Sequence, residues 1–264
     1  MEFPLIDPVA VELGPLVIRW YALAYLAGFV LGWRYALLLA DRMAPDSPTR
    51  TDIDDFLIWA IPAVILGGRF GYVFFYNPDY FAANPLDAFK IWQGGMAFHG
   101  GLLGMVLAMI VFARIRAIAL LRLSDVICCV APIGLFFGRM ANFINAELYG
   151  RVTDVSWGII FPGTDGQPRH PSQLYQAALE GLLIFAVLFA LVRLGFLQNR
   201  PGLISTVFLM LYGAARFIVE FFREPDAHIG LVTYGLSMGQ LLSLPMVLIG
   251  AVLMVFAVRR HDPR

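Results

Sequence analysis

The sequence predicts an all-α polytopic membrane protein with seven transmembrane helices and a small extracytoplasmic loop or hairpin region. Three observations predict this fold. Of the 264 residues, 59% are hydrophobic and 14% are charged, whereas a water-soluble domain carries roughly a quarter charged residues. Seven apolar stretches are each long enough to cross a bilayer, which takes about 20 residues. Basic residues gather in alternate connections between these stretches.

The seven predicted spans form one integral membrane domain that covers residues 1–264. Proline is tolerated at the start of a helix, and Pro171 and Pro201 stand where two of the spans begin. The predicted spans are residues 16–40, 53–75, 94–113, 124–144, 172–194, 202–222 and 236–258.

Two connections between spans carry structural signals of their own. In the connection 145–171, the run from Val155 to Phe161 is followed by Pro162 and Gly163, which favours a short strand and a turn. The connection 76–93 is rich in proline, asparagine and aromatic residues. Aromatic side chains concentrate at membrane interfaces, so we expect this loop to lie at headgroup depth.

The distribution of basic residues predicts the orientation of the chain. Loops on one side hold ten arginines, and loops on the other side hold four arginines and Lys90. By the positive-inside rule the first side faces the cytoplasm, so we expect the N-terminus outside and the C-terminus inside. The ten arginines are Arg42, Arg50, Arg114, Arg116, Arg122, Arg193, Arg200, Arg259, Arg260 and Arg264.

Other features of the composition narrow the class of protein. The first residues have no basic segment and no cleavage site of small residues, so we expect the first span to stay in the membrane. Nineteen cations balance nineteen anions, so no charge excess favours a nucleic-acid partner. Cys128 and Cys129 are adjacent within an apolar run, which favours packing over a disulfide or a metal site.

Ionisable residues within the spans are the strongest functional signal, because such groups are costly in lipid and normally face the interior of the bundle. Most of them fall toward the exterior half of their helices, which predicts a polar cavity that opens outward. The charged members are Arg69, His99, Arg139, Glu147, Glu180, Arg216 and Glu220, and the amides that accompany them are Asn142, Asn145, Gln173 and Gln176.

Helical spacing places several of these residues on common faces. Each face has a structural alternative: a pair of charges that neutralises itself, side chains that cap a helix end, or hydrogen bonds between helices. The three faces are Tyr212 with Arg216 and Glu220, Arg139 with Asn142 and Asn145 ahead of Glu147 and Gly150, and Gln173 with Gln176 and Glu180.

His99 lies in a glycine-rich segment that allows a neighbouring backbone or a lipid headgroup to approach closely. A buried structural histidine is the alternative. Gly67 and Gly71 form a small-xxx-small pair typical of helix packing, and Arg69 between them is either a headgroup contact or a structural counter-ion.

The chemistry of this set suits an anionic phospholipid. Arg139 and Arg216 stay protonated, so they are poor bases but good bidentate ligands for phosphate. His99 can exchange a proton near neutral pH. The set offers no convincing nucleophile, which favours a reaction whose nucleophile arrives on a second substrate.

At these residues the sequence resembles the phosphatidylglycerol–prolipoprotein diacylglyceryl transferase family over essentially the whole chain. The most specific match is the run Gly138-Arg-Met-Ala-Asn-Phe-Ile-Asn-Ala-Glu-Leu-Tyr-Gly-Arg151. Supporting matches are Trp20-Tyr21, Gly67-Gly-Arg-Phe-Gly-Tyr72, His99-Gly-Gly, His170-Pro-Ser-Gln-Leu-Tyr175 and Arg216-Phe-Ile-Val-Glu-Phe-Phe-Arg-Glu-Pro-Asp226.

The resemblance implies roles for individual residues. It implies that Arg139 and Arg216 engage the lipid phosphate. His99 matches the histidine that is proposed in the family as the base for the thiol proton. The resemblance also implies functional roles for Tyr21, Asn142, Glu147, Gly150, Tyr212 and Glu220. Several relatives have a histidine where this chain has Arg19, so the role of that histidine does not transfer.

The resemblance implies an enzyme of the bacterial inner membrane whose partners are phosphatidylglycerol, a preprolipoprotein signal peptide with its lipobox, and membrane lipid. We expect no cofactor and no metal, because the histidines at 99, 170, 228 and 261 lack ligand spacing. A transporter for an anionic solute is the main alternative, although no internal repeat supports it. A retinal receptor would need a lysine within a span, and Lys90 lies in a loop.

Overall fold

The computed structural model describes residues 1–4, 6–43, 48–224, 231–233 and 235–259. Arg260 and Arg264, which enter the orientation argument, and the end of the 216–226 motif lie outside these residues. The chain divides into two compact units, Met1–Ala36 with Asp125–Arg264 and Leu37–Ser124.

The structure is dominated by long apolar helices, as the sequence predicts. Among the described residues, six helical segments have the length and composition of a membrane span. They are α1 (Trp20–Met43), α2 (Arg50–Phe75), α4 (Phe98–Ile115), α5 (Leu120–Ile144), the continuous segment Ser172–Arg193, and α10 (Met238–Arg259). The sixth predicted span corresponds to α9 (Leu203–Val219), which has only 17 residues. At 1.5 Å per residue it is somewhat short for a hydrocarbon core about 30 Å thick.

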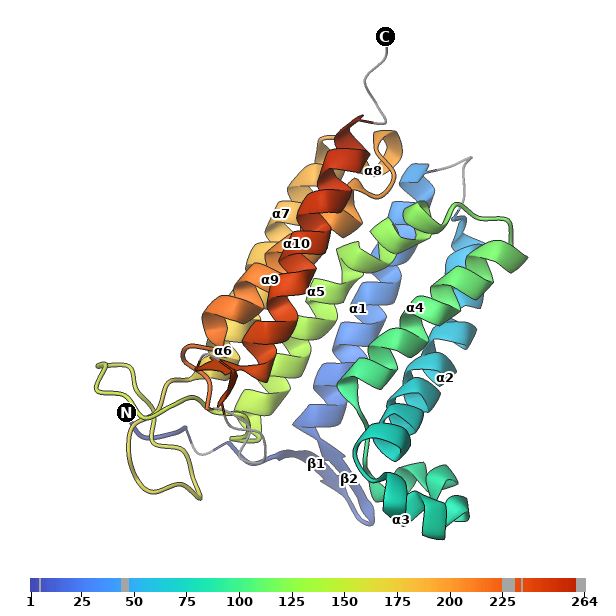
Figure 1. Cartoon of the computed structure of the whole chain (residues 1–264). Helices are drawn as coiled ribbons and strands as arrows, with labels where there is room; N and C mark the ends of the chain where they lie inside the picture. Colours follow the sequence, from blue (N-terminus) through green and yellow to red (C-terminus); the bar gives the residue numbers. More distant parts are fainter. Residues whose placement is uncertain (5, 44–47, 225–230, 234, 260–264) are drawn as a thin grey trace. The chain divides into compact units, whose positions relative to one another are not determined.

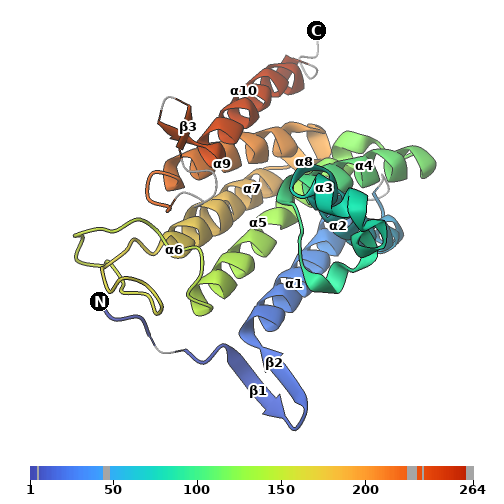
Figure 2. The ribbon, with the colours of Figure 1, turned by 60° about the horizontal axis from the view of Figure 1, so that its bottom comes forward.

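In the first unit, α5, α9, α10 and the segment Ser172–Arg193 run alongside one another (Figures 1 and 2). The last of these is not a uniform α-helix. It comprises α6 (Ser172–Gln176), the π-helical turn η3 (Ala177–Leu183) and α7 (Ile184–Arg193). A short helix, α8 (Phe196–Asn199), joins α7 to α9. π-helical turns widen a helix locally and often occur at functional sites.

A buried carboxylate joins α5 to the start of α9. Asp125 of α5 accepts hydrogen bonds from the backbone N–H of Gly202 at 2.6 Å and of Ser205 at 2.7 Å. The Ser205 hydroxyl donates to the same carboxylate at 2.6 Å. These bonds satisfy the free N–H groups at the start of α9 and fix its position along α5.

Two short hairpins precede helices that the sequence predicts to be longer. β1 (Val9–Leu13) pairs antiparallel with β2 (Leu16–Arg19), and the turn between them uses Gly14 at a φ of +61°. β3 (Leu231–Thr233) pairs with β4 (Leu236–Ser237) just before α10. The first and last spans therefore begin at residues 20 and 238 rather than 16 and 236, because the residues before them form strands.

The connection 145–171 forms isolated bridges instead of the predicted strand. Ile159 bridges Arg169, and Ile160 bridges Glu2 near the N-terminus. Phe3 packs with Phe143, Ile159 and Phe161 in a small buried cluster. The N-terminal residues thus complete a core for this connection, and only a long-range contact could have revealed it.

In the second unit, α2 and α4 pack closely through glycines. A β-carbon on Gly67 would collide with the backbone of Gly100, and one on Gly100 would collide with the backbone of Gly67. The helix-packing prediction for Gly67 and Gly71 is confirmed. Between the two helices, the connection 76–93 contains three short helices: α3 (Pro78–Ala83), η1 (Pro85–Phe89) and η2 (Ile91–Gln93).

Candidate active site

Arg139 and Arg216 converge on one buried carboxylate in the first unit. Arg139 lies on α5, and its Nη2 is 3.6 Å from Oε2 of Glu180 on η3. Arg216 lies on α9, and its Nη1 is 3.8 Å from Oε1 of the same residue. The Glu180 side chain is fully buried. Buried charges need partners, so this carboxylate holds together two cations that would otherwise repel each other.

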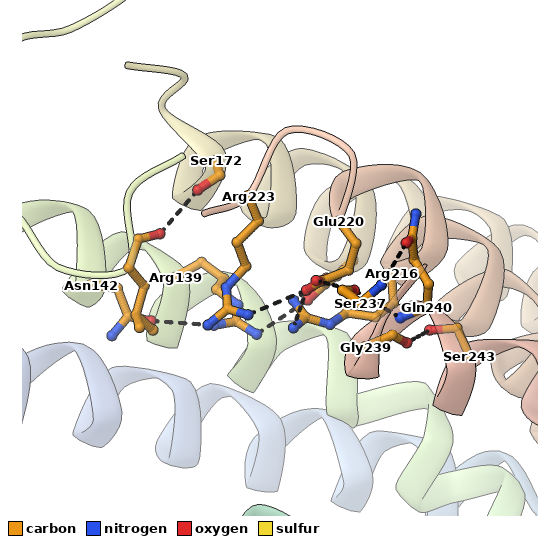
Figure 3. A network of polar contacts seen from close by, with 12 residues as sticks. Arg139, Asn142, Ser172, Arg216, Glu220, Arg223, Ser237, Gly239, Gln240 and Ser243 are labelled. Carbon is orange, nitrogen blue, oxygen red and sulfur yellow. Dashed lines mark hydrogen bonds and ion pairs between the residues drawn. The ribbon is translucent and has the colours of Figure 1, made fainter. Parts of the chain in front are cut away.

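Arg216 is also held by a carboxylate on its own helix. Its Nη2 lies 2.6 Å from Oε1 of Glu220, one turn further on. Glu220 in turn accepts a hydrogen bond from the Ser237 hydroxyl at 2.7 Å and lies 3.4 Å from Nη1 of Arg223 (Figure 3). A β-carbon on Gly239 would stand 2.6 Å from Cδ of Glu220, so a larger residue at this point of α10 would displace that side chain. Glu220 therefore joins α9 to the start of α10.

Arg139 belongs to a second chain of contacts at the end of α5. Its Nη1 donates to the Asn142 side chain at 3.5 Å, and the Asn142 amide donates to Glu147 at 2.9 Å. The backbone after α5 places Ala146 and Leu148 at φ values of 54° and 57°, which L-residues seldom adopt. The backbone oxygen of Glu147 accepts from Gln173 at 2.6 Å, and that of Leu148 accepts from Ser172 at 3.0 Å. The start of α6 thus holds a strained turn in place.

Gly150 takes part through its backbone. Its N–H donates to the carbonyl of His170 at 2.8 Å, and it bridges Arg223 just beyond α9. A β-carbon there would collide with the carbonyl oxygen of Phe222, so glycine allows the close approach of the two segments. This contact ties the run from Gly138 to Arg151, the signature segment, to the end of the helix that carries Arg216.

The connection 145–171 is also held by a chain of three side chains. Trp157 donates through Nε1 to the Tyr175 hydroxyl at 2.7 Å, and that hydroxyl lies 3.1 Å from Nδ1 of His170. Because Tyr175 accepts from Trp157, its own proton is free to bond an unprotonated Nδ1. Burial lowers the pKa of His170 below its usual value, and the charge of Asp154 opposes the shift.

The two predicted tyrosines lie on the helices next to this site. The Tyr21 hydroxyl is 3.1 Å from that of Tyr25, one turn along α1. The Tyr25 hydroxyl is 3.9 Å from the point where a β-carbon on Gly138 would stand, so the pair lies against α5 beside Arg139. Tyr212 stands one turn before Arg216 on α9, with its ring stacked on Phe208.

His99 and Arg69 belong to the second unit. His99 is exposed in the first turn of α4, with its ring against that of Phe98. Arg69 is buried and donates to the backbone carbonyls of Asp87, Ala88, Gly94 and Gly95, with its guanidinium over the Phe81 ring. These contacts make Arg69 the anchor of the connection 76–93, and its predicted contact with a headgroup stays a prediction.

Sequence reasoning noted Glu180 but did not include it among the site residues. Its only sequence signal is an acid within an apolar run, on one face with Gln173 and Gln176. Ser237 contacts Glu220 from 17 residues further along the chain. Arg223 contacts Glu220, and Gln240 contacts Ser237, each across three residues. In the described residues, His, Cys, Asp and Glu side chains form no group that could hold a metal ion.

Comparisons with known proteins agree on one family. A family model described as prolipoprotein diacylglyceryl transferase matches residues 8–256. Three relatives carry the name phosphatidylglycerol–prolipoprotein diacylglyceryl transferase. The protein from Azospirillum brasilense is 58% identical over 98% of this chain and 97% of its own length. The proteins from Paramagnetospirillum magneticum and Rhodospirillum rubrum are 55% and 53% identical, over 98% and 100% of this chain and 97% and 96% of their own.

Proposed function

The chain belongs to the prolipoprotein diacylglyceryl transferase family, and we propose that it catalyses diacylglyceryl transfer from phosphatidylglycerol to prolipoproteins. The acceptor is the thiol of the lipobox cysteine, the product is a thioether, and glycerol 1-phosphate leaves. This reaction is the first step of lipoprotein maturation. The family model and the relatives confirm the family resemblance that the sequence predicted. The long apolar helices identify a multi-pass membrane protein.

The convergence of two guanidinium groups on one buried carboxylate is the observation that supports this reaction best. The cysteine sulfur attacks the glycerol carbon that bears the phosphate, and the carbon–oxygen bond breaks. Its electron pair goes to the departing oxygen, so a phosphodiester with one negative charge becomes a phosphomonoester with nearly two. Arg139 and Arg216 bind the phosphate and stabilise the charge that develops on it. One such group is worth about 3–4 kcal/mol of barrier.

The neighbouring acids and amides orient the two arginines. Glu220 contacts Arg216 and holds it in place. Asn142 contacts Arg139 and is itself held by Glu147. A side chain that is held by its neighbours loses less freedom when it binds a phosphate, which lowers the cost of reaching the transition state.

The thiol must lose its proton, because the thiolate is the competent nucleophile. We assign this step to His99, directly or through water, since its side chain is exposed and an imidazole nitrogen can accept a proton. Near-normal turnover in His99→Gln, together with an inactive Arg139→Ala, would remove His99 from the mechanism and leave the phosphate ligand intact.

The remaining predicted residues have supporting roles. We assign Tyr21, Tyr212 and Arg69 to the binding of phosphatidylglycerol. Gly150 belongs to the same group through the backbone contact that holds the signature segment against the end of α9.

We further propose that the whole chain is one membrane domain of the bacterial inner membrane, with α9 as a short span that brings the total to seven. The N-terminus and the connection 145–171 are then extracytoplasmic, and the C-terminus is cytoplasmic. A cysteine placed next to Gly163 and one placed at the end of α10 test this arrangement. An impermeant thiol reagent added to intact spheroplasts should label the first and not the second.

Mass spectrometry of the purified protein tests the reaction itself. The protein in detergent is incubated with phosphatidylglycerol and a lipobox peptide. We expect the peptide to gain the mass of a diacylglyceryl group on its cysteine, and we expect no gain in Arg139→Ala or with a Cys→Ser peptide. Binding of phosphatidylglycerol with no adduct in the wild type would contradict the proposal.

A further inference from the structure

One face of the α6–η3 segment carries three fully buried polar side chains, those of Gln173, Gln176 and Glu180. Gln173 donates through Nε2 to the backbone of Glu147, but its Oε1 has no hydrogen-bond partner among the described residues. Neither Nε2 nor Oε1 of Gln176 has a partner within that part of the chain. Buried side-chain amides are nearly always hydrogen-bonded, so one donor and two acceptors remain unexplained.

These free groups lie beside the proposed phosphate site. Gln173 contacts the turn that contains Glu147, and Glu180 contacts Arg139 and Arg216. Gln176 falls between them on the same face, about 4–6 Å along the helix from each. A three-carbon group attached to a phosphate that Arg139 and Arg216 hold would reach this position.

We propose that Gln176, together with the free oxygen of Gln173, recognises the glycerol headgroup of phosphatidylglycerol. The proposal rests on the function proposed above and names the residues that select its lipid. The headgroup carries two neighbouring hydroxyl groups, each a donor and an acceptor. Their protons match Oε1 of Gln173 and Oε1 of Gln176, and one hydroxyl oxygen accepts from Nε2 of Gln176.

The same arrangement disfavours other phospholipids. A headgroup without hydroxyls leaves the amides unpaired, and sites built to bind a hydroxyl strongly reject analogues that lack it. An ethanolamine headgroup would bring an ammonium group beside two guanidinium groups. Glu180 does not offset this repulsion, because both arginines already share its charge.

The test compares phosphatidylglycerol with phosphatidylpropanol, which has the same carbon skeleton and no headgroup hydroxyls. Thioether formation on a lipobox peptide is measured with each lipid, and phosphatidylpropanol is also tested as a competitor. Gln176→Met keeps the length of the side chain and removes its hydrogen bonds. We expect kcat/KM for phosphatidylglycerol to fall about 10–100-fold. We expect turnover and competition with phosphatidylpropanol to change by less than about 3-fold.

A matched control is Gln198→Met on α8, which follows the far end of α7 from Gln176 and should leave the headgroup preference unchanged. Without lipid, Gln176→Met should unfold at or above the wild-type temperature, because it removes an unpaired buried amide. If that variant does not fold, Gln176→Leu takes its place in the same comparison.

Three results would overturn the proposal. Equal losses with both lipids would give Gln176 a structural role, and an unchanged rate with phosphatidylglycerol would give it none. A changed KM for the peptide with an intact lipid preference would place the residue at the peptide. A wild-type protein that forms no thioether with either lipid would instead reject the proposed function.

Discussion

Replacing Gly239 by alanine pushes a methyl group into the carboxylate that orients Arg216. The new β-carbon would stand 2.6 Å from Cδ and 2.8 Å from Oε1 of Glu220. Carbon atoms prefer separations of roughly 3.5–4.0 Å, so Glu220 or the start of α10 must move by about 1 Å. The contact of 2.6 Å between Arg216 and Glu220 then lengthens or turns.

The expected effect on turnover is larger than the effect on stability. A misplacement of about 1 Å costs on the order of 100-fold in rate. Overpacking destabilises by about 1–3 kcal/mol, and alanine in a helix recovers about 0.5–1 kcal/mol of that relative to glycine. The net loss of stability is therefore about 2.5 kcal/mol or less. The assay is thioether formation with phosphatidylglycerol and a lipobox peptide, alongside thermal unfolding in detergent.

Gly134→Ala on α5 is the matched control, because a β-carbon at Gly134 meets no atom within 4 Å. It should keep full activity and gain a little stability. If Gly239→Ala retained turnover within about 3-fold of the wild type, the position of Glu220 would not control Arg216.

Three further predictions follow from other contacts. Arg139→Lys keeps the charge but not the bidentate geometry, so turnover should fall at least about 10-fold, and full activity would make bidentate recognition unnecessary. Because burial lowers the pKa of His170, the unfolded chain binds more protons than the folded one below about pH 6.5. The contribution of His170 to the free energy of unfolding is complete above that pH and is lost as the pH falls through the folded pKa. A wild-type melting temperature that falls no more steeply in acid than that of His170→Gln would contradict this. Arg69→Ala removes hydrogen bonds to four carbonyls, each worth roughly 1.5–3 kcal/mol. It should expose the connection 76–93 to proteolysis, and an unchanged cleavage pattern would deny the anchoring role.

The helices were predictable because long apolar runs are a local signal. Errors arose where an apolar run was not a helix. Leu16–Arg19 is as hydrophobic as a span, yet it pairs with β1, because Gly14 allows the turn that brings the two strands together. The short helices between residues 78 and 93 lie in a segment whose proline and asparagine content predicts only a loop.

The site was partly predictable for a related reason. Arg139 and Arg216 stand out because charged residues are rare in apolar helices. Glu180 stands out for the same reason, but the sequence does not mark it as their common partner, because it meets them only once three separate helices pack. No local sequence signal marks Ser237 or Gly239, because their roles come from the approach of α10 to Glu220.

In the proposed mechanism, the two arginines stabilise the phosphate as it departs. Single-turnover rates of thioether formation at saturating phosphatidylglycerol, for the wild type, Arg139→Ala and Arg216→Ala, test it most directly. We expect losses of about 10²–10³ in each variant even when lipid is saturating, because the interaction strengthens in the transition state. Wild-type rates at saturating lipid, with only a raised KM, would show that the arginines bind the substrate without stabilising the departing phosphate.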